Sequence, residues 1–134
     1  MRERATVVCW QNDRVLLVAR QRGRWALPGG TIAHGETALE AVDRELAEET
    51  GLAGYLFEYL FQFGGLSKRH HVFQTTVPND AVPKADNEIV RCRWFKVRKV
   101  STLAASVPTR QIVELAICHR NVTIPVLDDG TSRR

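Results

Sequence analysis

The sequence predicts an α+β fold in which a central mixed β-sheet lies between helices, an α/β/α sandwich. Two pairs of β-branched and aromatic runs are each joined by a few turn residues, which is typical of hairpins. A strongly helical segment separates the two pairs, and a second one follows a further strand. With 134 residues and 44% hydrophobic content, the chain predicts one domain over residues 1–134, in which residues 124–134 form a flexible tail.

The strands are expected where β-branched and aromatic residues are bounded by turn residues. They are residues 5–10, 15–20, 55–63, 70–77 and 89–97. Residues 21–35 hold four glycines and one proline, so we expect a loop there with a short extended piece at residues 25–27. His70 and His71 are neighbours in a strand and point to opposite faces, and we expect structural roles for both.

Residues 37–50 form the strongest predicted helix. Thr37 is placed to cap its start, Glu40 completes a capping box three residues later, and Gly51 is placed to end it. Residues 108–119 form a second predicted helix, which begins with a proline suited to the first turn. The chain therefore predicts one helix between its strands and one after them.

The first helix places acidic side chains beside its buried face. At about 100° per residue, Leu39, Val42 and Leu46 share a stripe that must face the core. A neighbouring stripe holds three glutamates at positions i, i+3 and i+4, namely Glu45, Glu48 and Glu49. These carboxylates repel one another and no lysine lies four residues further on, so the pattern favours a metal site over an ion-paired surface helix. Glu49 lies close in angle to Val42, where its charge is hard to solvate.

Charge is distributed unevenly along the chain. From Glu36 to Glu49 there are six acids and one base, whereas the other 120 residues carry 18 bases and nine acids. An acidic segment on a basic protein fits a metal site that faces a polyanion, although a solvated helix face gives the same charge pattern. Magnesium prefers carboxylate oxygens, water and substrate phosphates as ligands. Residues 27–30, Leu-Pro-Gly-Gly, allow a sharp turn near this face, so their carbonyls are further candidate ligands.

Cysteine usage and hydropathy exclude several classes of protein. The three cysteines are widely spaced and form no CxxC or Cys/His cluster, so we expect neither a zinc site nor a disulfide framework, and a cytoplasmic location fits. No apolar run approaches the roughly 20 residues that span a bilayer. The charged start of the chain has no apolar segment behind it, so we expect no signal peptide and no membrane partner.

The segment from Gly30 to Leu52 resembles the signature of the Nudix hydrolases without a departure. It reads Gly30-x5-Glu36-x7-Arg44-Glu45-Leu46-x-Glu48-Glu49-x-Gly51-Leu52. Residues 25–29 and 88–95 are also similar to flanking patterns of that family, so the resemblance extends from about residue 7 to residue 115. It implies the α/β/α Nudix fold and an enzyme that cleaves a pyrophosphate bond in a nucleoside diphosphate linked to another moiety.

The same resemblance implies the metal ligands. Glu45, Glu48 and Glu49 would hold Mg²⁺, with Mn²⁺ as a substitute, and Gly29 or Gly30 would add a backbone carbonyl. The physical chemistry agrees, because bound cations reverse the sign of an acidic surface that would otherwise repel an anionic diphosphate.

The resemblance also implies the catalytic and supporting residues. Arg44 would orient a catalytic glutamate, and either Glu45 or Glu49 would act as the base that takes a proton from water. Glu36 and Gly30 would lie next to the metal ligands without binding the metal and would hold the junction of loop and helix in place.

Substrate choice is expected to lie outside the motif. Arg20 ends a strand that would point toward the phosphates, and Glu88 precedes the last strand, where it would bind a base edge or a further metal. An ordinary solvated position explains each of these two residues as well. The small size and the segment from Glu88 to Trp94 favour the MutT-like group, which acts on nucleoside triphosphates.

Two alternatives remain on the same fold. Five basic residues between positions 91 and 99 fit a nucleotide-sensing or RNA-binding module, although the complete set of carboxylates argues against a pure binder. An RNA 5′-end pyrophosphohydrolase would share the machinery and differ in its leaving group. We expect a small nucleotide diphosphate derivative as the partner, with nucleic acid less favoured, and a homodimer would use a sheet edge or a helix face.

Overall fold

The computed structural model describes residues 1–123, which form six strands, two α-helices and one 3₁₀ helix. The expected tail, residues 124–134, lies outside the described residues. The elements are β1 (Arg2–Gln11), β2 (Arg14–Arg20), β3 (Gly29–Thr31), α1 (Ala38–Thr50), β4 (Glu58–Gly64), β5 (Lys68–Thr76), β6 (Ile89–Lys96), η1 (Val97–Thr102) and α2 (Val107–Thr123). Within residues 1–123, neither helix combines the length and apolar character needed to cross a membrane.

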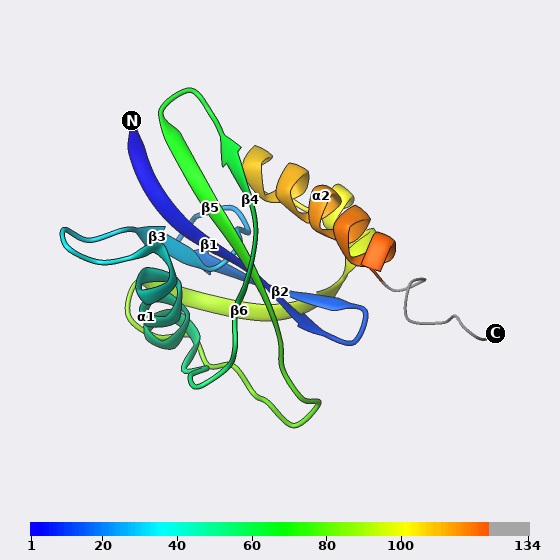
Figure 1. Ribbon diagram of the computed structural model, residues 1–134. Coiled ribbons are helices and arrows are strands. Elements are labelled where there is room, and N and C mark those ends of the chain that lie inside the picture. The colour runs from blue at the N-terminus through cyan, green and yellow to red at the C-terminus, as the bar shows by residue number, and fades with distance from the viewer. Residues whose placement is uncertain (124–134) are drawn as a thin grey trace.

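The strands form one mixed sheet with a helix on each face. The strand order is β4-β5-β1-β2-β6, and β3 pairs with part of β1. The β1–β5 pair is parallel and the others are antiparallel. Helices α1 and α2 pack on opposite faces (Figure 1), because α1 joins one apolar cluster and α2 the other. The predicted α+β sandwich with a mixed sheet is therefore confirmed.

One edge of β1 is shared between two strands. Its first half, Arg4–Thr6, pairs with β3, whereas only its last two residues, Trp10 and Gln11, pair with β2. Beyond the turn, β2 instead pairs along its whole length with β6. Because β1 and β2 diverge, a cleft opens between them on the face that carries α2.

Helix α1 begins and ends as the sequence predicts. The Thr37 side chain accepts a hydrogen bond from the Glu40 N–H, the Glu40 carboxylate accepts one from the Thr37 N–H, and Gly51 ends the helix in the left-handed conformation at φ 75°. One predicted core residue is wrong, because Leu39 is 51% exposed. Ala41 is fully buried in its place, which rotates the core-facing stripe toward the side that carries Glu49.

The loop before α1 and the last helix also differ from expectation. Residues 25–27 form only isolated bridges, from Trp25 to Ala105 and from Ala26 to Val18, and the extended segment is β3 at Gly29–Thr31. The predicted loop therefore contains a strand, because β1 offers a free edge that the glycines can approach. Helix α2 runs from Val107 to Thr123, four residues beyond the predicted end.

Leu46 and Leu39 provide a matched test of how α1 packs. Leu46 is 1% exposed in the core under the sheet, so Leu46→Ala should lower the free energy of unfolding by about 2–5 kcal/mol. Leu39→Ala removes the same atoms from an exposed position and should change it by less than about 1 kcal/mol. Urea denaturation with a metal chelator measures both variants, and equal losses would show that α1 does not pack as described.

Candidate active site

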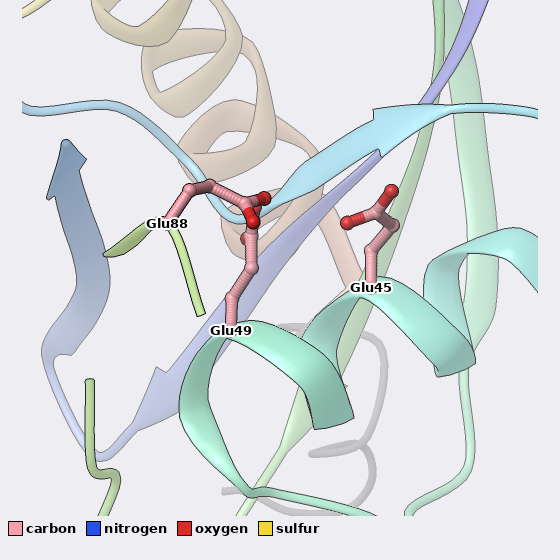
Figure 2. Close-up of side chains that lie close together, drawn as sticks. All are labelled: Glu45, Glu49 and Glu88. Atoms are coloured by element: carbon pink, nitrogen blue, oxygen red, sulfur yellow. The ribbon is translucent and has the colours of Figure 1, made fainter. Parts of the chain in front are cut away.

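Three carboxylates from distant parts of the chain meet beside β3. Glu45, Glu49 and Glu88 each offer an oxygen atom, and these oxygens all lie within 4.8 Å of one another. Figure 2 shows Glu45 and Glu49 rising from α1 toward β3, while Glu88 reaches over from the segment that leads into β6. Glu45 and Glu49 are four residues apart, so the helix stacks them on one face.

The carboxylate of Glu49 is the most buried of the three. The residue is 2% exposed, and its Oε1 accepts one hydrogen bond from the Gly29 N–H at 3.1 Å. The pKa of Glu49 is raised to about 7, chiefly by burial; the nearby Glu45 and Glu88 act in the same direction, and the hydrogen bond from Gly29 opposes them. Burial also raises the pKa of Glu45. The helix therefore holds two acids where their charge is costly unless a cation is present.

Two glycines let β3 approach the carboxylates. Gly29 has φ 149°, and a Cβ there would overlap the Ala5 carbonyl of β1. A Cβ on Gly30 would overlap the Glu45 carboxylate. Any side chain at position 30 would therefore displace the Glu45 carboxylate.

The segment before β6 is fastened to the end of α1. The N–H groups of Lys84 and Asp86 donate to the carbonyls of Thr50 and Glu49, and the Asn87 side-chain amide donates to the Glu48 carbonyl. These bonds satisfy carbonyls that a helix end leaves without partners. Asn87 has φ 55°, a left-handed conformation that asparagine tolerates. The attachment places Glu88 next to Glu49.

Arg44 ties three glutamates together at the outer side of the cluster. Its Nε and Nη2 donate to both oxygens of Glu36 at 2.7 and 2.9 Å, and its Nη1 donates to Glu45 at 3.3 Å and to Glu48 at 3.2 Å. Glu36 also accepts the Ala33 N–H at 2.8 Å. The Arg44 hydrogen bonds lower the pKa of Glu36 to about 2. This bidentate pair fixes the guanidinium, which in turn holds the Glu45 carboxylate in place.

Glu48 lies outside the carboxylate cluster. Its side chain is 50% exposed and is paired with Arg44, whereas the Glu45 side chain is 12% exposed. The sequence motif groups Glu48 with Glu45 and Glu49. The described residues instead bring Glu88 to the third position.

The carboxylates stand at one end of a cleft lined by arginines. A cavity of about 360 Å³ is bounded by Glu49, Gly29 and Ile89 and by three cationic side chains, Arg4, Arg20 and Arg24. A second cavity of about 280 Å³ shares Arg4, Ala26, Leu27 and Ser106 with the first and continues toward Lys68 and His70. A larger cavity, about 550 Å³, lies at the other end of β1 around Trp10, and none of the three carboxylates lines it.

Arg20 forms an ion pair with the carboxylate cluster, whereas Arg4 lines the cleft without one among the described residues. Arg20 Nη2 lies 3.6 Å from Glu88 Oε1, so both predicted substrate-binding residues lie at the cluster. Arg4 lines both cavities and forms no ion pair among the described residues, although Glu49 and Glu45 attract it. Burial lowers the pKa of Arg4. No local sequence pattern marks Arg4, because only the pairing of β1 with β3 brings it beside the cleft.

The two histidines have the expected structural contacts. His70 Nδ1 lies 2.9 Å from Thr6 Oγ1, and His71 Nε2 lies 2.7 Å from Glu3 Oε1 on the other face of β5. Burial, followed by the charges of Arg4 and Lys68, lowers the pKa of His70 to about 4. His70 is therefore neutral at pH 7 and adds no charge to the cleft.

The donor set fits a hard divalent cation. Magnesium takes carboxylate oxygens together with water and phosphate, and Glu45, Glu49 and Glu88 supply three carboxylates within reach of one another. The buried, poorly compensated carboxylate of Glu49 and the absence of a Cβ above Glu45 both suit an ion at this position.

Comparison with known proteins identifies the family. The family model described as NUDIX domain matches residues 1–115. The chain belongs to the Nudix family. Among solved structures, a Nudix hydrolase family member from Chromobacterium violaceum superposes with a TM-score of 0.80 at 31% identity, covering 90% of this chain and 79% of that one.

Two curated relatives of this chain carry different names. Rat diphosphoinositol polyphosphate phosphohydrolase 2 is 31% identical over 147 residues, which cover 98% of this chain and 82% of the rat protein. A Mycobacterium tuberculosis protein that carries the name mutator protein MutT4 is 31% identical over 106 residues, 72% of this chain. This chain spans only 43% of the length of that mycobacterial relative.

The raised pKa of Glu49 predicts an inverted pH dependence of stability in the metal-free protein. From about pH 4.5 to pH 7 the folded state keeps the Glu49 proton that the unfolded chain releases, so stability should fall as the pH rises. In chelator at pH 8, Glu49→Gln should therefore be more stable than the wild type by up to about 3 kcal/mol, and the two should converge near pH 4.5.

Urea denaturation between pH 4.5 and 8 measures this difference. Glu48→Gln is the control, because it removes a charge from the same helix at a half-exposed side chain outside the carboxylate cluster. Addition of Mg²⁺ should stabilise the wild type and not Glu49→Gln. A wild type that is more stable than Glu49→Gln at pH 8 in chelator would contradict the account.

Proposed function

We propose that this Nudix protein is a Mg²⁺- or Mn²⁺-dependent hydrolase that cleaves a pyrophosphate bond in a nucleoside diphosphate linked to another moiety, with nucleoside triphosphates as the first candidate substrates. One observation carries the proposal. Three clustered carboxylates stand at the end of a cleft whose walls carry Arg4, Arg20 and Arg24. Carboxylates alone would repel a diphosphate, and arginines alone would only bind it. Together they suit an anionic substrate held against a cation site.

The cluster supplies the ligands in this proposal. Glu45, Glu49 and Glu88 would hold the cation, with Glu48 at the exposed rim and a backbone carbonyl of Gly29 or Gly30 beside them. When bound, the cation would supply Lewis-acid activation of water and neutralise phosphate charge.

The side chains around the cluster would bind phosphate, accept a proton and position the carboxylates. Arg4 and Arg20 would bind phosphate oxygens, because both reach the cavity that Glu49 borders. Glu45 or Glu49 would accept the proton of the attacking water, because both carboxylates lie in the cluster at the end of the cleft. Arg44 is a positioning residue, which holds the Glu45 carboxylate through a guanidinium that Glu36 fixes.

The names of the relatives support the coarse reaction and differ on the substrate. The rat relative is named for diphosphoinositol polyphosphate, and the mycobacterial one for a mutator function. A substrate screen should therefore include nucleoside triphosphates, their oxidised forms, ADP-ribose, dinucleoside polyphosphates and diphosphoinositol polyphosphates, each with Mg²⁺ and with Mn²⁺.

Loss of either buried helix carboxylate should abolish most of the activity. We expect Glu45→Gln and Glu49→Gln to lower kcat by roughly 10²–10⁴-fold on the best substrate of the screen, because each removes a ligand and a candidate base. Asp43→Asn is the matched control, since Asp43 is exposed on the same helix and lies outside the cluster. Steady-state assays with product identification measure the effect. Full activity in both glutamate variants would refute the proposal.

Arg4 should contribute to substrate binding. Removal of a charged hydrogen bond to phosphate should raise KM in Arg4→Ala by about tenfold or more. Arg4→Lys should restore part of the affinity, because it keeps the charge and loses the planar fork. Arg14→Ala, an exposed arginine at the far end of β2, should leave KM unchanged. The same KM in wild type and Arg4→Ala would remove Arg4 from the binding site.

A further inference from the structure

Three hydrogen-bond donors line the second cavity of the cleft, away from the carboxylate cluster. This cavity of about 280 Å³ is bounded by Arg4, Lys68 and His70 on the strands and by the first turn of α2. In the parallel pair of β1 and β5, Arg4 lies beside His70, and Lys68 comes two residues before His70 on the same face of β5. We call Arg4, Lys68 and His70 the donor row. Among the described residues that line this cavity, none is acidic.

The hydroxyl of Thr6 determines which nitrogen of His70 carries the proton. Both residues are buried, with exposed fractions of 4% and 9%, and Thr6 Oγ1 lies 2.9 Å from His70 Nδ1. Within residues 1–123 the Thr6 hydroxyl has no other acceptor. A buried hydroxyl proton without an acceptor is costly, so the hydroxyl donates to Nδ1. The proton of the neutral imidazole is therefore on Nε2.

The Nε2–H group of His70 has no acceptor in the described part of the chain. The residue lines the cavity, and its printed hydrogen bond is the one to Thr6 through the other nitrogen. The side chains of Arg4 and Lys68 likewise form neither a hydrogen bond nor an ion pair with a described residue. Thr109 on the α2 side differs, because its Oγ1 already accepts two hydrogen bonds.

Fold stability does not account for the donor row. Water can solvate Lys68, which is exposed, but a buried N–H without an acceptor costs stability. Arg4 brings positive charge close to His70, and this charge helps to lower the pKa of the imidazole. Two cationic groups and a neutral N–H in one cavity suit an anion that has several acceptor atoms.

We propose that the donor row binds a phosphoryl group that the substrate carries outside its anhydride, so that nucleotides phosphorylated at a second position are preferred. This inference rests on the proposed function and specifies its substrate class. Arg4 lines both cavities, so one ligand can extend from the carboxylate cluster to the donor row. A phosphate monoester offers three acceptor oxygens and up to about two negative charges, which match one N–H and two cationic side chains.

Calorimetric titration with ligands that lack an anhydride tests the proposal without hydrolysis. Adenosine 2′,5′-bisphosphate and adenosine 3′,5′-bisphosphate are compared with AMP in Mg²⁺, and at least one of them should bind about tenfold tighter or more. Lys68→Ala should reduce this preference about threefold. Arg69→Ala is the matched control, because Arg69 is an exposed cation next in sequence that points to the other face of β5, and it should retain the preference.

A pair of variants separates binding by His70 from packing. His70→Phe keeps a ring, removes the Nε2–H group and should reduce the preference for the bisphosphate about tenfold. It also leaves the Thr6 hydroxyl without an acceptor, so Thr6→Val is combined with it. The double variant should regain thermal stability and remain as weak a binder as His70→Phe. Recovery of the bisphosphate preference in the double variant would show that His70 acts through packing alone and would overturn its place in the donor row.

Hydrolysis supplies the second arm. ADP-ribose 2′-phosphate is compared with ADP-ribose, and adenosine 3′-phosphate 5′-diphosphate with ADP. In at least one pair kcat/KM should be about tenfold higher for the substrate with the additional phosphate, and Lys68→Ala should lower that ratio.

Two results would overturn the proposal. One is equal affinity of the wild type for AMP and both bisphosphates, with ratios of kcat/KM near one in both pairs. The other is an equal loss of preference in Lys68→Ala and Arg69→Ala, because the effect would then come from the overall charge of the protein. If none of the four anhydrides were hydrolysed and the bisphosphate preference remained, the proposed function would fail and the phosphate-binding role of the donor row would stand.

Discussion

Burial of the Glu49 carboxylate is the constraint on which the rest of the site depends. Helix α1 turns this residue inward, where it is 2% exposed. The Gly29 N–H donates a hydrogen bond to its carboxylate, and oxygens of Glu45 and Glu88 lie within 4.8 Å. Such an arrangement lowers the free energy of unfolding when no cation is bound, and a bound cation raises it. Arg44 pairs with Glu36, Glu45 and Glu48, and no hydrogen bond or ion pair joins it to Glu49 within the described part of the chain. Arg44 pairs with Glu45 and Arg20 with Glu88, whereas the buried Glu49 carboxylate forms no ion pair among residues 1–123.

The path of β1 gives this site its substrate cleft. Strand β3 pairs with the first half of β1, and β2 pairs only with its last two residues. The sheet therefore divides near Gly29, whose N–H donates to Glu49. The split exposes Arg4 from β1 and Arg20 from β2 on its two sides. One irregularity of strand pairing thus opens the cavity, lets the glycines approach the carboxylates and places cations opposite them.

The parts of the fold that follow local rules were predictable from the sequence. The capping box of Thr37 and Glu40, the end of α1 at Gly51 and the inward position of Glu49 depend on neighbours within one or two turns. Leu39 was misplaced because the direction of a helix's buried face depends on what packs against it. Arg4 and Glu88 reach the site through contacts across about 40 residues of sequence. No local pattern marks Arg4, and the sequence left Glu88 between a site role and a solvated position. The motif likewise could not show that Glu48 would pair outward with Arg44.

Diffraction from crystals soaked in Mn²⁺ tests the central claim most directly. The anomalous signal locates manganese without reference to activity. We expect a manganese peak bounded by carboxylate oxygens of Glu45, Glu49 and Glu88, with Glu49 still beneath β3. A map without manganese at that position, and with the three side chains turned apart toward bulk water, would contradict it.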